Sequence, residues 1–444
     1  MSDKTITGKW NRLGTLGPSL GNLAMRAFLE NYLGIPANHI HHAEAIKKAL
    51  GSLKGPIMKI AQMLASIPGA VPDEYRDSFR ELQTNAPAMS AYFALRRMTA
   101  ELGRSPHDMF QSFSSEPFAA ASLGQVHHAK HCDGTDLVCK IQYPDMHNTV
   151  CADIAHVHRF LSVYQGQTPA LDVQNVVSEL EQRLYEELDY DLEAKNTNLF
   201  ARIFAAMLGG GMHVRVPRVY AEYSTKKLLT MMRCSGTPVY AVMDQSQEWR
   251  NVCAQTLFRA WYIPFYTCGV IHGDPHTGNY SVDLSTDTLN IYDFGCVRRF
   301  TPRFVMGVIR LYRALLNDDK AACAEAYEQW GFKGLSPAVI ETLNLWSRYV
   351  YAPLLDDRVR PIDEEYTSTK GRTLAAAVFQ ELRAQGGVSP PHEFVFLDRA
   401  TVGMGGVFMT LRASLNWHQE FETLIAGLDE NIIQANQEKF GVWS

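Results

Sequence analysis

The sequence lacks the features that mark a membrane-spanning or secreted protein. Its longest uncharged stretch, residues 260–273, contains a histidine and is shorter than the roughly 18–20 apolar residues that a spanning helix requires. The first residues include no apolar core of a signal peptide. We therefore expect a cytoplasmic protein with at most peripheral membrane contact, for which residues 8–33 offer an amphipathic segment that we expect to pack on the domain.

Two further absences exclude other classes. The eight cysteines form no CxxC pair, which argues against a zinc site and favours reduced thiols over a disulfide framework. A net charge of −5 and the lack of a basic tract argue against nucleic acid as a partner. With 444 residues, of which 46% are hydrophobic, the chain can bury a large core and should form more than one domain.

The most informative motif is HGDPHTGN at residues 272–279, followed by YDFG at residues 292–295. This order and spacing are typical of a phosphotransfer site of the protein-kinase type. In such a site the loop aspartate, which is Asp274 in this sequence, positions the acceptor hydroxyl. The loop asparagine and the DFG aspartate hold Mg²⁺ on the phosphates of ATP. Asn279 and Asp293 are the corresponding metal ligands in this sequence.

A nucleotide-binding region precedes this motif. Residues 136–142 alternate in hydropathy and predict a strand, on which Lys140 would contact the α- and β-phosphates. Upstream, at residues 117–128, alanine mostly replaces the glycines of a phosphate loop and only Gly124 remains. Because methyl groups narrow the accessible backbone conformations, this loop should be stiffer than a glycine-rich one.

A carboxylate partner for Lys140 is expected in residues 178–196. Leucines at positions 180, 184, 188 and 192 recur every fourth residue and predict a helix. Glu187 lies beside this stripe and is our candidate, with Glu179 and Glu186 as competitors that helix phase does not exclude. We interpret Glu193, like Glu181, as a solvated surface residue.

Four blocks together resemble the UbiB/AarF family of atypical kinase-like proteins, the group linked to ubiquinone (coenzyme Q) biosynthesis. They are Lys59-Ile60-Ala61-Gln62, similar to the KxGQ motif of the family; AAASLGQVH at residues 119–127; EELDYDLEAKN at residues 186–196, which contains an ExD motif at Glu187 and Asp189; and HGDPHTGN with DFG. Two positions depart from the pattern, Ala61 where glycine is usual and Thr277 where proline is usual. Neither departure removes a charged or metal-binding group.

The resemblance implies an α+β, two-lobed protein-kinase-like fold with an N-terminal helical extension packed over the active site. In such a fold Lys59 and Gln62 would enter the space where a protein kinase receives its peptide, beside Glu187 and Asp189. The catalytic set would then be Asp274, Lys140, Glu187, Lys59 and Gln62. ATP would be bound by Ala119, Ala120, Ala121, Ser122, Gly124, Gln125, Lys140, Met231 and Arg233, with Mg²⁺ on Asn279 and Asp293. The implied partners are a lipid or quinone precursor and quinone-biosynthesis proteins.

We expect three regions. Residues 1–115 would form the helical extension, with helices near 20–33, 40–65 and 90–103; residues 116–233 the small lobe; and residues 234–444 a mainly helical large lobe. Residues 216–224 and 228–233 predict strands of the small lobe, and the second would lead into the adenine-binding hinge. Residues beyond about 330 contain no recognisable motif.

Three functions agree with these patterns. The first is a UbiB-type ATP-dependent kinase or ATPase that supports isoprenoid-quinone biosynthesis or lipid homeostasis. The second is a small-molecule kinase of the aminoglycoside or choline phosphotransferase type, which shares the HGDxHxxN loop but not the first two blocks. The third is a nucleotide-binding scaffold without catalysis, which the retained Lys140, Asp274, Asn279 and Asp293 disfavour.

Overall fold

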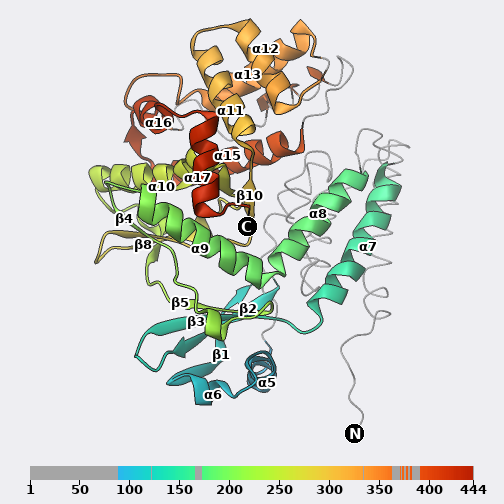
Figure 1. The fold of residues 1–444 in the computed structure, drawn as a ribbon, viewed down its shortest axis with the longest axis vertical. Helices are drawn as coiled ribbons and strands as arrows, with labels where there is room; N and C mark the ends of the chain where they lie inside the picture. Colours follow the sequence, from blue (N-terminus) through green and yellow to red (C-terminus); the bar gives the residue numbers. More distant parts are fainter. Residues whose placement is uncertain are drawn as a thin grey trace, which may run out of the picture. The chain divides into compact units, whose positions relative to one another are not determined.

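The computed structural model describes residues 89–443, apart from residues 122, 166–172, 334, 363–370, 372, 375–376, 379–380 and 383–390 (Figure 1). The predicted helices near 20–33 and 40–65, the segment 8–33 and the KxGQ-like block lie outside the described residues. By internal contacts, the chain divides into two compact units. Unit 1 contains the described residues up to Leu192 together with Val219–Met232, and unit 2 contains Glu193–Arg218 and the chain from Arg233 onward.

A four-stranded antiparallel sheet is the main element of unit 1, with strand order β1-β2-β3-β5. Along β3, Leu137, Cys139 and Ile141 are fully buried, as expected for a strand with one face on a core. The strands predicted at residues 136–142 and 228–233 are confirmed. The bounds are β1 Ser112–Ala121, β2 Gly124–Lys130, β3 Asp136–Gln142 and β5 Leu228–Met232.

Helices α5 (Ala91–Leu102) and α6 (Pro106–Met109) complete the core of this sheet. Met98 of α5 is fully buried and clusters with Phe110, Leu137 and Ile141. The helix predicted at residues 90–103 is therefore confirmed, and it ends where Gly103 adopts a left-handed conformation.

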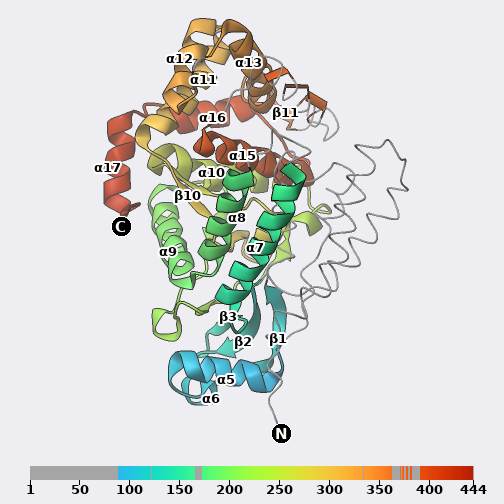
Figure 2. The same cartoon turned by 90° about the vertical axis from the view of Figure 1, so that its right-hand side faces the viewer.

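Helices α7 (Met146–Gln165) and α8 (Val173–Glu187) occupy the insertion between Lys140 and the ExD motif and lie side by side (Figures 1 and 2). The single helix predicted through residues 178–196 is wrong, because α8 ends at Glu187 and α9 (Tyr190–Met207) begins three residues later. The carboxylate of Asp189 accepts a hydrogen bond from the Leu192 amide at 3.0 Å, which starts a new helix there. Period-four leucines cannot reveal such a break, since they continue across it.

The strand predicted at residues 216–224 is also wrong. That stretch holds a single bridge between Val219 and Met231 and the short helix η1 (Ala221–Tyr223). Pro217 lacks the amide hydrogen that a ladder would need. A short strand instead precedes it, β4 (His213–Arg215), which pairs in parallel with β9 of unit 2.

In its described residues, unit 2 combines three small sheets with a large set of helices. One sheet has the order β4-β9-β8-β6 and another pairs β7 with β10. A third pairing joins β11 to β12. The strand bounds are β6 Thr237–Pro238, β7 Val270–His272, β8 Tyr280–Asp283, β9 Thr288–Ile291, β10 Val297–Arg299, β11 Arg360–Pro361 and β12 Ser414–Leu415.

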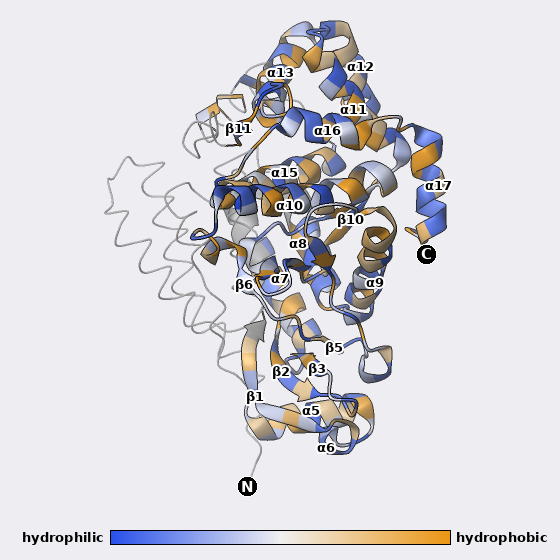
Figure 3. Ribbon diagram, turned by 90° about the vertical axis from the view of Figure 1, so that its left-hand side faces the viewer, coloured by the Kyte–Doolittle hydropathy of each residue, from blue (hydrophilic) through white to orange (hydrophobic). Residues whose placement is uncertain are grey.

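Most described helices of unit 2 begin at polar caps and turn apolar faces inward, whereas α15 begins after Pro391 without a side-chain cap. Ser246 caps α10 and Thr301 caps α11, each accepting from an amide three residues later. Helices α11 and α17 each contain both hydrophobic and hydrophilic residues, as amphipathic helices do (Figure 3). None of the described helices is long and apolar enough to cross a membrane. The bounds are η2 Val239–Ala241, α10 Gln247–Cys268, η3 Thr277–Asn279, α11 Pro302–Leu316, α12 Lys320–Trp330, α13 Pro337–Tyr351, α15 His392–Leu411, α16 Trp417–Ile425 and α17 Glu430–Phe440.

The core of unit 2 surrounds α10. Its aromatic residues Phe258, Trp261 and Phe265 are almost fully buried. The helix ends at Gly269, whose φ is +64°, and a side chain there would collide with the Phe300 carbonyl. From this rigid end the chain enters β7, which leads directly to the HGDPHTGN motif.

We predict that Gly124→Ala destabilises unit 1 by about 1–3 kcal/mol, because overpacking against a strand backbone cannot relax easily. A Cβ at Gly124 would collide with the Ile141 carbonyl across the β2–β3 ladder. Urea denaturation measures the change. Gly209→Ala is the control, since Gly209 has open space around it and should change stability little. Equal stability of both variants would contradict the assigned packing.

The burial of Asp398 on α15 leads us to predict that the stability of the protein depends on pH. Trp346 Nε1 donates to its carboxylate at 2.7 Å, and burial raises the pKa of Asp398 to about 6. A carboxyl with a raised pKa binds more protons in the folded state, so its contribution to stability falls as pH rises from about 4 to 6. We predict that Asp398→Asn stabilises the protein at pH 7 by on the order of 2 kcal/mol and little at pH 4. Denaturation profiles of both proteins across this range should converge at low pH; parallel profiles would refute the effect.

Candidate functional site

Short strand pairs hold the two motif loops of unit 2 together. β7 ends at His272, where the HGDPHTGN loop begins, and pairs with β10, which follows the DFG residues. β8 leaves the same loop after Asn279 and pairs with β9, which leads into DFG. The Tyr292 amide donates to the Asn279 carbonyl at 2.9 Å. The strand pairing therefore brings the two motif loops side by side.

The buried imidazole of His272 braces both loops. Its Nδ1 accepts from the Asp274 amide at 3.3 Å, and its Nε2 lies 3.1 Å from the Tyr292 carbonyl oxygen. Because the amide can only donate, Nδ1 carries no proton, and the proton resides on Nε2, which donates to Tyr292. His272 is thus a neutral structural link, only 2% exposed.

Asn279 is oriented by Asp274. Its Nδ2 donates to the Asp274 carbonyl oxygen at 2.9 Å and to the Asp274 carboxylate at 3.2 Å. Both hydrogens of the amide are used in these bonds, which identifies the remaining atom as the carbonyl oxygen Oδ1. Oδ1 is the atom that a metal ion would require.

Asp293 lies at a sharp turn of the chain. Its φ is +56°, a left-handed conformation that aspartate and asparagine tolerate better than most residues. One carboxylate oxygen accepts from the Gly295 amide at 3.2 Å. The turn therefore uses one oxygen of Asp293 for its own geometry.

One face of α9 packs on the DFG turn. Asn196 Nδ2 donates to the Phe294 carbonyl at 3.0 Å, and Phe200 contacts the Phe294 ring. Glu193, one turn earlier, is 2% exposed and borders Gly295 together with Asp293. The interpretation of Glu193 as a solvated residue is therefore wrong. Its i, i+3, i+7 spacing with Asn196 and Phe200 was the signal that could have identified this face.

These residues fit a magnesium ion. Asn279 and Asp293 supply oxygen donors, and Mg²⁺ typically takes one or two carboxylates while water and phosphate oxygens complete its shell. Among the described residues, no three histidine, cysteine, aspartate or glutamate side chains gather into a protein-only metal site. The donor set thus suits a metal that arrives with a phosphate ligand.

Unit 1 contains Lys140 and the ExD turn on one face of β3. The Lys140 ammonium lies 5.0 Å from the centroid of the buried Tyr190 ring. Gln142, two residues on and therefore on the same face, donates to the Leu188 carbonyl at 2.6 Å. The turn between Glu187 and Asp189 is thereby tied to the strand that carries Lys140.

The carboxylates considered as partners of Lys140 differ in their local contacts. Glu179 pairs with Arg183, and Glu186 accepts from Gln182 at 2.9 Å, both within α8. Asp189 caps α9. Glu187 is the last residue of α8, next to the turn that Gln142 holds, and it stays our candidate.

The alanine-rich segment is a β-hairpin. Ala119, Ala120 and Ala121 pair with Val126, Gln125 and Gly124, respectively. The Gln125 side chain is buried: its oxygen accepts from the Met89 amide at 2.7 Å, and its nitrogen lies 2.6 Å from His127 Nε2. Any contact of Gln125 with a nucleotide would therefore come from its main chain. The expected stiffness of the segment stays a prediction.

The remaining candidates divide into two groups. Met231 lies on β5, opposite Val138, and Arg233 follows the end of that strand. Ser122, Lys59 and Gln62 lie outside the described residues, so their roles stay predictions.

Helix α15 is a neighbour of the loop that no sequence motif indicated. A side chain at Gly403 would touch Pro275, and one at Gly273 would collide with Phe396. Tyr280, directly after the loop, approaches Met404. Residues far beyond the motifs thus cover the loop that contains Asp274.

Comparison with known proteins gives a consistent result. Residues 81–327 match the family described as ABC1 atypical kinase-like domain. Among curated relatives, ACTIVITY OF BC1 COMPLEX KINASE 8, chloroplastic, of Arabidopsis thaliana is 28% identical over 82% of this chain and 51% of its own length. Atypical kinase COQ8B, mitochondrial, of Rattus norvegicus is 27% identical over 71% of this chain and 62% of its own. The chain thus spans about half to three fifths of these relatives.

Among solved structures, the Rv3197–erythromycin complex from Mycobacterium tuberculosis aligns with a TM-score of 0.60 and 28% identity. The alignment covers 88% of this chain and 99% of that one. The kinase-like α+β fold expected from the motifs is therefore confirmed.

We predict that His272→Phe lowers the free energy of unfolding by about 1–3 kcal/mol, because the Asp274 amide and the Tyr292 carbonyl lose their partner while the ring contacts persist. Urea denaturation followed by tryptophan fluorescence measures this loss. His276→Phe is the control, since the His276 side chain is exposed and its one hydrogen bond to the described residues is from the Gly278 amide. A His272→Phe protein as stable as the control would refute the bracing role.

Proposed function

The chain belongs to the ABC1 atypical kinase-like family, and from this premise we propose that it binds ATP with Mg²⁺ and acts as an atypical phosphotransferase or ATPase of the UbiB type. The observation that carries the proposal is the orientation of Asn279. Two hydrogen bonds to Asp274 turn its amide so that the carbonyl oxygen is left for a metal, within a loop bonded to Tyr292, the neighbour of Asp293.

The proposed roles follow from the chemistry of each group. Asn279 and Asp293 would bind Mg²⁺, which neutralises charge on the transferred phosphoryl group. Asp274 would position the acceptor hydroxyl, and its bonds with Asn279 fix it for that task. Lys140 would bind the α- and β-phosphates with Glu187 as its partner, and the Ala119–Ala121 hairpin would cover the phosphates through its main chain.

We propose that the phosphoryl acceptor is not a protein. With Lys59 and Gln62 in the peptide-receiving space, as the resemblance implies, a small or lipid acceptor or water would replace a protein substrate. The name of the relative COQ8B describes a mitochondrial atypical kinase, and the UbiB resemblance favours isoprenoid-quinone biosynthesis or lipid homeostasis as the setting. We propose peripheral membrane contact for access to such a precursor.

A second candidate is a small-molecule kinase. The specific observation in its favour is that a structural relative is known as a complex with erythromycin. A screen of hydroxylated small molecules and quinone precursors with radiolabelled ATP separates the two candidates by the compound that acquires the label.

We predict that Asp293→Asn removes most of the thermal stabilisation that Mg²⁺-ATP confers, because the main charged metal ligand is lost. Asparagine tolerates the left-handed backbone at this position, so the fold should persist. Differential scanning fluorimetry with and without Mg²⁺-ATP gives the result.

Asp287→Asn is a matched control for this experiment. Asp287 is another aspartate of unit 2 with a positive φ, +47°, but it lies in the turn between β8 and β9 and accepts from Trp249. The control should retain the full nucleotide response. If Asp293→Asn responds to Mg²⁺-ATP as strongly as the control does, the metal assignment fails.

A further inference from the structure

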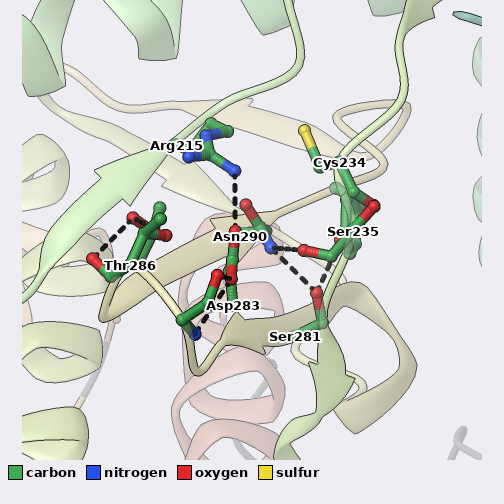
Figure 4. A network of polar contacts seen from close by, with 10 residues as sticks. Arg215, Cys234, Ser235, Ser281, Asp283, Thr286 and Asn290 are labelled. Atoms are coloured by element: carbon green, nitrogen blue, oxygen red, sulfur yellow. Dashed lines mark hydrogen bonds and ion pairs between the residues drawn. The ribbon is translucent and has the colours of Figure 1, made fainter. Parts of the chain in front are cut away.

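The segment that follows β5 is fastened to the β4-β9-β8-β6 sheet by a polar network around the buried side chains of Asn290 and Ser281. Asn290 of β9 is fully buried, and its Nδ2 donates to the Ser235 carbonyl at 3.0 Å and to Ser281 Oγ at 3.1 Å. Ser281 of β8 contacts the Tyr292 hydroxyl at 2.5 Å, and that hydroxyl donates to the Cys234 carbonyl at 3.3 Å. Figure 4 shows Asn290 directed at Ser235 and Ser281.

The direction of every bond in this network is determined. The Ser235 and Cys234 carbonyls can only accept, so Asn290 and Tyr292 must donate to them. Since the Tyr292 hydrogen is used, Ser281 donates to the Tyr292 oxygen and accepts from Asn290. Two consecutive main-chain carbonyls are therefore bound by side chains of Asn290 and Tyr292, in the segment that leads into the DFG motif.

Close packing adds a second constraint. A Cβ at Gly236 would lie 2.5 Å from Ser281 Oγ and 2.9 Å from Asn290 Nδ2. The main chain thus approaches the network as closely as glycine allows. Arg215 of β4 and Asp283 of β8, 3.6 Å apart, brace the same sheet (Figure 4).

Asn290 acts in this network through its donors. Its Oδ1 is buried and has no hydrogen-bond partner among the described residues, a cost that an apolar residue of the same size would avoid. The compensation is that both hydrogens of Nδ2 fasten the Ser235 segment, directly or through Ser281. A residue that packed only for stability would not need this polarity.

We infer that Asn290, with Ser281 and Tyr292, is a positioning residue that fixes the main chain from Cys234 to Gly236 and thereby sets the register in which the preceding residues read the nucleobase. The inference rests on the proposed ATP binding, in which Met231 and Arg233 lie next to the nucleobase. Because the Cys234 and Ser235 carbonyls already accept from side chains, the main chain before them is favoured for recognition of the base. A fixed register distinguishes adenine from guanine, whose hydrogen-bonding edges carry opposite donor and acceptor patterns.

The test compares binding of ATP, GTP and tripolyphosphate, each with Mg²⁺, by thermal shift and by displacement of a fluorescent nucleotide. Asn290→Asp keeps the shape and replaces the donors by acceptors that face the Ser235 carbonyl. Ser281→Ala is a milder second variant, should the first not fold. We expect the preference for ATP over GTP to fall about tenfold, the equivalent of one hydrogen bond, while tripolyphosphate affinity is unchanged.

Asn344→Leu is the matched control. Asn344 is a buried asparagine of α13 that accepts from the Tyr327 hydroxyl at 3.0 Å, away from the segment after β5. Its loss should lower stability without changing the ATP to GTP ratio. If Asn290→Asp and Ser281→Ala keep the wild-type ratio, or if the control changes it equally, the inference fails. If the unmodified protein binds no Mg²⁺-ATP, the proposed function fails, and the inference with it.

Discussion

The placement of the motif residues in unit 2 depends on one buried imidazole. His272 accepts the Asp274 amide and donates to the Tyr292 carbonyl, so a single side chain fixes the start of one loop relative to the start of the other. Asn279 then depends on Asp274 for its orientation. His272 thus positions Asp274, and Asp274 positions Asn279. His272 is itself placed by β7, which begins directly after the C-terminal end of α10.

Local patterns in the sequence predicted the elements whose cause is local. Alternation predicted β3, which is confirmed. The motif spacing pointed to the loop of Asp274 and Asn279 and to the DFG residues, whose roles stay predictions, while the left-handed turn at Asp293 was not predicted. The break after Glu187 was missed because the leucine stripe continues across it, and a single capping carboxylate, Asp189, decided the outcome. Whether Asp189 caps a new helix depends on one hydrogen bond, and the composition of the segment does not reveal that bond.

The parts of the site that were missed depend on long-range packing. Glu193 belongs to a charged stretch, and its burial follows from the contact of α9 with the turn at Phe294, about a hundred residues later. The cover that α15 provides over Pro275 joins residues still farther apart and rests on the small size of Gly403. No motif spacing encodes such contacts. Lys59 and Gln62 were identified by resemblance and lie outside the described residues.

The way in which the two units share the chain also constrains the order in which the protein can fold. β1, β2 and β3 are neighbours in sequence, but the sheet takes its fourth strand from residues 228–232. Residues 193–218, which belong to unit 2, lie between the two pieces of unit 1. During synthesis, the ribosome must therefore release part of the second unit before the first can close its sheet. Until β5 is made, the edge of β3 has no strand to pair with, and an unpaired edge is a place where a nascent chain can associate wrongly.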